Sequence, residues 1–153
     1  MNNKGFTLIE LLAAIMLLAV IMTISTFSVI SAINRSKSNS YDSLKEYTKI
    51  AVKEYYDECK NSDIISTKID CDNLYEQEYN VYTVEITLKE LLDYGFLKSS
   101  AKEENNKIIK NPTNDANMNN CIIRLMVLIS DDGTVEEKYF FDESEECVKK
   151  DLG

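Results

Sequence analysis

Histidine is absent from this 153-residue chain, which has only one proline and four glycines. Without histidine, the chain lacks the side chain that most often serves as a general base, a pH switch or a metal ligand. The scarcity of proline and glycine argues against long flexible linkers. Acidic residues outnumber basic ones by 26 to 17, giving a formal net charge of −9. This balance argues against a broad basic surface for nucleic acid, and we expect no strong nucleic-acid partner.

No catalytic constellation stands out among the residues that are present. The chain contains no Walker-type glycine loop and no G-x-S-x-G sequence, so we expect a protein that is not an enzyme and needs no cofactor. Acidic neighbours such as Asp131 and Asp132 are interpreted as solvated surface. A calcium site on this Asp131–Asp132 turn would lack the full EF-hand spacing. We therefore predict neither catalytic residues nor a metal site.

Four cysteines, Cys59, Cys71, Cys121 and Cys147, lie after the hydrophobic N-terminal segment. An even count confined to one part of the chain predicts two disulfides formed outside the cytoplasm. Of the three possible connectivities, we favour Cys59–Cys71 and Cys121–Cys147, because each pair brackets one local unit. Four free buried thiols are the alternative. A zinc site is disfavoured, because the spacings lack C-x2-C knuckles and no histidine can help.

The N-terminal segment is a long apolar run: residues 6–33 contain one charged residue, Glu10. As a helix they would extend roughly 42 Å, more than the ~30 Å hydrocarbon core of a bilayer. The run is too long for the hydrophobic region of a secretory signal peptide. A plain membrane anchor fits the length but leaves Glu10 unexplained, because a carboxylate in a membrane helix is costly. Lys4 precedes the run, and Arg35 and Lys37 follow it, so charge alone does not orient the helix.

The stretch from Lys4 to Leu12, KGFTLIELL, resembles the cleavage and methylation motif of type IV prepilins and of the pseudopilins of type II secretion. The resemblance implies that prepilin peptidase cuts between Gly5 and Phe6, and that Phe6 is then N-methylated. It also implies that Glu10, one helical turn further on, neutralises the new terminal amine of Phe6 as subunits dock. A subunit out of register would leave a charge buried and alone, which is strongly unfavourable.

The resemblance also orients the chain, with its N-terminus inside and its C-terminus outside. It implies a single-pass membrane protein that later enters a cell-surface pilus or pilus-like filament. The expected partners are prepilin peptidase, the membrane before assembly, and other pilin subunits. Major pilin, minor pilin and pseudopilin of a secretion or DNA-uptake machine remain open. A membrane-tethered binding module that does not polymerise is an alternative of another class.

The helix is expected to continue beyond the apolar run. Residues 6–60 contain neither glycine nor proline, whereas many major pilins carry both along this helix, so we expect a continuous helix here. Apolar side chains at helical spacing predict an amphipathic continuation over residues 34–60 that packs on the rest of the chain. This stripe contains Tyr41, Leu44, Tyr47, Thr48, Ala51, Val52, Tyr55 and Cys59. The expected division is a leader over 1–5, an anchor over 6–33, this continuation, and a head over 61–153.

A short helix and an antiparallel hairpin are the clearest elements of the head. Thr87-Leu88-Lys89-Glu90 forms a capping box, and Gly95 suits a helix end, so a helix is predicted between them. Residues 121–130 and 135–141 read as strands, separated by the turn signal Asp131-Asp132-Gly133-Thr134.

The other parts of the head are less patterned. Residues 61–78 and 101–120 are polar and are expected to be loops, with a turn at 111–114. Residues 81–86 read either as a short strand or as an approach to the helix. The expected fold class is α+β and pilin-like, with a long N-terminal helix packed on a small antiparallel sheet.

Overall fold

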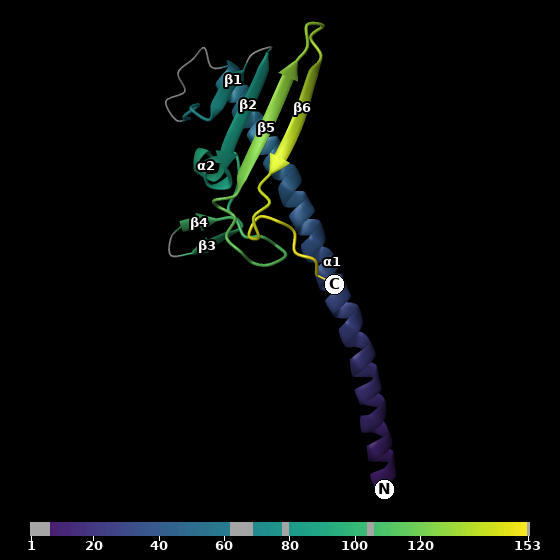
Figure 1. The fold of residues 1–153 in the computed structure, drawn as a ribbon. Coiled ribbons are helices and arrows are strands. Elements are labelled where there is room, and N and C mark those ends of the chain that lie inside the picture. The colour runs from purple at the N-terminus through teal and green to yellow at the C-terminus, as the bar shows by residue number, and fades with distance from the viewer. Residues whose placement is uncertain (1–6, 62–68, 78–79, 104–105, 153) are drawn as a thin grey trace.

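The computed structural model describes residues 7–61, 69–77, 80–103 and 106–152, the side chains of 23–27, 101–103 and 106 excepted. A long helix, α1 (Leu8–Asn61), dominates the structure. Its C-terminal half lies across one face of a sheet, while its N-terminal half projects from the head (Figure 1). At the standard rise, the 54 residues of α1 extend about 80 Å. The predicted α+β, pilin-like arrangement is confirmed.

The sheet is antiparallel, and its four strands lie in the order β1-β2-β5-β6. These strands are β1 (Leu74–Gln77), β2 (Val81–Thr87), β5 (Ile122–Ile129) and β6 (Val135–Phe141). The helix α2 (Leu88–Tyr94) follows β2 directly, with the N-cap and the left-handed C-cap glycine that the sequence predicts. A small ladder of β3 (Ala101–Glu103) and β4 (Asn106–Ile108) lies below the sheet (Figure 1).

Strand β5 supplies the centre of the core because its apolar side chains alternate. Ile123, Leu125 and Val127 are buried and belong to one hydrophobic cluster with Val52 and Tyr55 of α1. Strand β6 returns through a turn in which Gly133 adopts a φ of 84°, a conformation that favours glycine. The predicted hairpin is therefore confirmed, and β5 becomes an inner strand of a wider sheet.

Most of the predicted apolar stripe of α1 packs on the head. Tyr41, Thr48 and Tyr55 are buried, as expected. The expectation is wrong for Tyr47, which is 66% exposed, and it omits Tyr56, which is 3% exposed. At about 100° per residue, Tyr47 falls just beyond Ala51, which marks the edge of the buried face, whereas Tyr56 falls inside the opposite edge.

Two regions expected to be loops contain strands. Residues 61–78 include β1, whose side chains are mostly exposed and therefore show no hydrophobic alternation. Backbone pairing with β2 holds β1 at the sheet edge. Residues 101–120 include β3 and β4, and this region also buries Ile109 and Met118. The ambiguous residues 81–86 belong to strand β2.

Candidate functional site

The N-terminus of α1 is closed by a capping box made by Thr7 and Glu10. The backbone N–H of Thr7 donates to Glu10 Oε2 at 2.9 Å, and the Thr7 hydroxyl donates to the same oxygen at 2.7 Å. In return, the backbone N–H of Glu10 lies 3.4 Å from Thr7 Oγ1. A capping box satisfies backbone donors that the first helical turn leaves without partners. Glu10 thus has a structural role inside its own chain.

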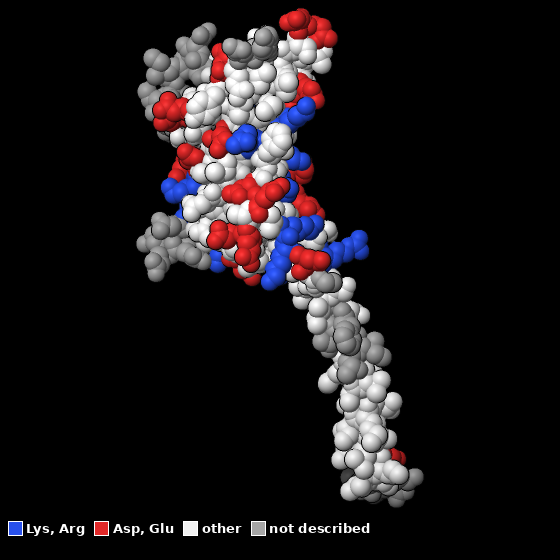
Figure 2. Space-filling view, in the orientation of Figure 1, with Lys and Arg blue, Asp and Glu red and all other residues white. Residues whose placement is uncertain are grey.

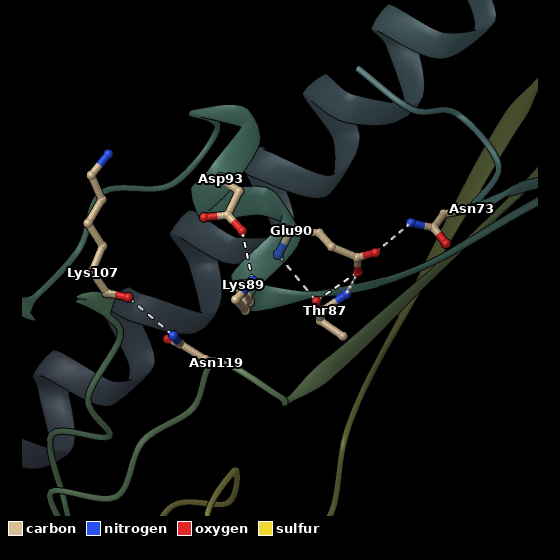
Figure 3. A network of polar contacts seen from close by, with 7 residues as sticks. All are labelled: Asn73, Thr87, Lys89, Glu90, Asp93, Lys107 and Asn119. Carbon is tan, nitrogen blue, oxygen red and sulfur yellow. Dashed lines mark hydrogen bonds and ion pairs between the residues drawn. The ribbon is translucent and has the colours of Figure 1, made fainter. Parts of the chain in front are cut away.

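The same Thr-Leu-x-Glu sequence starts α2, where it forms the same arrangement. The N–H and hydroxyl of Thr87 donate to Glu90 Oε2 at 2.8 and 2.7 Å. Figure 3 shows that the side chain of Glu90 also reaches Asn73, whose amide donates to Oε1 at 3.2 Å. Partial burial raises the pKa of Glu90, but these hydrogen bonds outweigh it, and the pKa lies below its usual value. The helices α1 and α2, although very different in length, therefore both begin with a capping box.

The remaining N-terminal site residues predicted from the sequence are Gly5 and Phe6, and both lie outside the described residues. The cleavage site, the methylated residue and the charge pair between Phe6 and Glu10 therefore stay predictions. The contact between Thr7 and Glu10 is a feature that sequence reasoning missed. The same four-residue spacing that identified the box at Thr87 was present here and could have revealed it.

The projecting half of α1 exposes a dense set of apolar side chains. Between residues 8 and 33, large apolar side chains are 44–78% exposed. They are Leu8, Ile9, Leu11, Leu12, Ile15, Met16, Leu17, Leu18, Val20, Ile21, Met22, Val29, Ile30 and Ile33. Apolar surface on this scale marks an interaction site with lipid or protein. Within the described part of the chain, no helix is long and apolar enough to cross a membrane.

Two disulfides hold the head together, and they join the pairs that the sequence favours. Cys59 at the end of α1 is linked to Cys71, and Cys121 before β5 is linked to Cys147 after β6. The Cα atoms are 5.7 Å apart in both. None of the described cysteines is free. The pairing is typical of a domain that folds in an oxidising compartment.

In the acidic turn between β5 and β6, the side chain of Asp132 accepts a hydrogen bond from the backbone and so stabilises the turn. The backbone N–H of Thr134 donates to Asp132 Oδ1 at 2.9 Å, and this bond lowers the pKa of the Asp132 carboxyl. Across the residues that the structure describes, no group of three or more Cys, Asp or Glu side chains could hold a metal ion.

Comparison with known proteins gives a match, which lies at the N-terminus. Residues 1–26 match the family described as the prokaryotic N-terminal methylation motif. The chain therefore carries the signature of type IV prepilins and pseudopilins at the start of a pilin-like fold. This motif is the cleavage site of prepilin peptidase, and pilins assemble with other pilin subunits. No curated protein and no solved structure matches the chain.

Proposed function

We propose that this chain is a structural subunit of a type IV pilus or pilus-like filament. Prepilin peptidase cleaves between Gly5 and Phe6 and methylates Phe6, and the N-terminal helix anchors the subunit until it enters the filament. The match of residues 1–26 to the N-terminal methylation motif carries this proposal. The exposed apolar side chains of α1 support it, because lipid and neighbouring helices are the surfaces that would cover them.

The chain divides, in this account, into a leader over 1–5, an anchor and filament-core helix over 6–33, its continuation over 34–60, and a head over 61–153. The two disulfides support a head outside the cytoplasm. Glu10 pairs with the methylated amine of a neighbouring subunit during docking, which sets the register of the growing filament.

The test is a filament assay with a single substitution. Glu10→Ala should leave the subunit in the membrane and remove it from filaments sheared from the cell surface. Glu54→Ala is the matched control, because Glu54 is an exposed glutamate in the continuation of the same helix. Normal entry of the Glu10→Ala subunit into filaments, or the absence of filaments from wild-type cells, would contradict the proposal.

The same motif supports a second candidate, a pseudopilin of a secretion or DNA-uptake machine. Neighbouring genes for pilus assembly and retraction motors favour the pilus, whereas neighbouring secretion or DNA-uptake genes favour the pseudopilin. A tethered binding module that never polymerises is the remaining alternative. It predicts a processed subunit that stays in the membrane fraction and is missing from every sheared filament.

A further inference from the structure

The segment after β6 runs back along α1 toward its projecting half. Residues 142–152, here called the tail segment, form turns and irregular chain beside the helix (Figure 1). The Tyr41 hydroxyl donates to the carbonyl of Cys147 at 2.7 Å. Further down the helix, the side-chain amide of Asn34 donates to the carbonyl of Leu152 at 2.8 Å. The tail segment thus reaches the turn of α1 that follows the last apolar residue of the run, Ile33.

A buried asparagine fixes the tail segment in this position. Asn111 is 0% exposed, and its Nδ2 donates to the carbonyls of Glu146 and Val148 at 2.9 and 2.8 Å. Its Oδ1 accepts from the N–H and hydroxyl of Thr113, and Thr113 Oγ1 accepts from the backbone N–H of Lys150 at 3.0 Å. A buried side-chain amide that forms all of these hydrogen bonds holds the backbone segments that it contacts in fixed positions. The backbone at Lys150 is therefore held in a defined place.

The tail segment brings two lysines next to the basic residues of α1. A groove of about 460 Å³ lies between the helix and the tail segment. We call it the neck groove, and the lining residues used here are Ser31, Arg35, Ser38, Lys149 and Lys150. Figure 2 shows basic side chains, with acidic ones between them, at the base of the head where the projecting helix begins.

Two cations of the neck groove form no ion pair within the described ranges of the chain. Lys149 Nζ lies 2.7 Å from an Asp42 carboxylate oxygen. Asp151 also lines the groove and has an interaction partner. Arg35 and Lys150 are exposed, and neither forms an ion pair with any residue that the structure describes. Arg35 and Lys150 line the same groove, and their charges are therefore free to bind an external anion.

The position of the groove indicates which anion would meet it. A helix over residues 6–33 extends roughly 42 Å, and a bilayer with its headgroups is about 40–45 Å thick. With that helix as the membrane anchor, Arg35 lies at the level of the headgroups on the outer side. Phosphate groups of anionic lipids attract Lys and Arg at this depth.

We propose that the neck groove binds the phosphate group of an anionic phospholipid in the outer leaflet while the subunit waits in the membrane. Arg35 and Lys150 supply the charge, and the hydroxyls of Ser31 and Ser38 are available as donors. The tail segment serves to preorganise this site. The inference rests on the proposed membrane anchor. The lipid holds the head at a fixed height above the bilayer, and it must leave when the subunit enters a filament.

Native mass spectrometry of the full chain in detergent tests the site, with phosphatidylglycerol and phosphatidylcholine added in turn. The wild type should prefer phosphatidylglycerol. The double variant Arg35→Gln/Lys150→Gln should lose affinity for it by about 25-fold, since one cation near an anionic surface is worth roughly fivefold. The control Lys89→Gln/Lys138→Gln removes two charges from lysines in head ion pairs and should bind like the wild type.

Each other outcome overturns the proposal in a distinguishable way. Equal binding of the two lipids, or unchanged binding by the Arg35→Gln/Lys150→Gln variant, excludes the site. Displacement of the lipid by millimolar inorganic phosphate would identify a site for free phosphate. Loss of filaments with unchanged lipid binding would assign the groove to contacts between subunits. Failure of the wild type to float with phosphatidylcholine vesicles would instead refute the anchor, and with it the proposed function.

Discussion

Substitutions at Thr7 and Glu10 separate two roles that the carboxylate of Glu10 can have. The structure shows it in a capping box with Thr7. The proposed function gives it a second role as the partner of a neighbouring terminal amine. Thr7→Ala removes the cap and keeps the charge. Glu10→Gln keeps a residue that suits a capping box but removes the charge, because glutamine replaces glutamate in such boxes.

The expected free-energy costs of Thr7→Ala and Glu10→Gln differ in magnitude. Losing an N-cap threonine costs about 1 kcal/mol, which changes an equilibrium by roughly fivefold. Leaving a buried charge without its partner costs about 3–5 kcal/mol, or roughly two to four orders of magnitude. We therefore expect Thr7→Ala to lower the yield of filaments modestly and Glu10→Gln to abolish them.

The assay is the ratio of subunit in sheared filaments to subunit in the membrane, measured by immunoblot for each variant. The membrane fraction controls for synthesis and stability. If Glu10→Gln assembles like the wild type while Thr7→Ala does not, the carboxylate acts only as a helix cap, and the charge-pair argument is refuted.

Three further predictions concern the head and can be measured on the full chain in detergent. Replacing Cys121 and Cys147 together by serine should lower the free energy of unfolding by about 3–4 kcal/mol in chemical denaturation, since the bridge closes a 26-residue separation; an unchanged midpoint would contradict this. Because the pKa of Glu90 is lowered from its usual value of 4.5, its carboxylate stabilises the head at pH values above 4.5, and this stabilisation is lost as the pH falls through the lowered pKa. Glu90→Gln should therefore make the free energy of unfolding fall less steeply with pH on the acid side. An unchanged dependence on pH would contradict this. Tyr55→Phe should cost about 1–3 kcal/mol, because the Tyr55 hydroxyl donates to the carbonyl of Asp70 at 2.6 Å; thermal unfolding measures the loss, and a neutral result would show that water replaces the bond.

Local signals with a definite spacing predicted the fold well. The capping box at Thr87 and the glycine at Gly95 gave the bounds of α2, because both ends of a short helix are set by neighbouring residues. The turn signal at Gly133 predicted the β5–β6 hairpin, because the residues of a tight turn also act locally.

Features that depend on pairing with a distant segment were not predictable from local pattern. Strand β1 lies at a sheet edge with exposed side chains, and only its backbone bonds to β2 define it. The buried Asn111 looked like a turn residue in a polar stretch, but its side chain binds carbonyls of Glu146 and Val148, far along the chain. For the candidate site, the resemblance to prepilins implied a partner for Glu10 in another subunit, whereas its partner in the same chain, Thr7, was missed.

The most direct test of the account is mass spectrometry of the mature N-terminus. Cleavage after Gly5 by prepilin peptidase predicts a protein that begins with Phe6, bearing one methyl group on its terminal nitrogen. The same protein from cells that lack the peptidase should keep residues 1–5. An intact Met1 in wild-type cells, or a terminus near Ala32, would contradict the assignment.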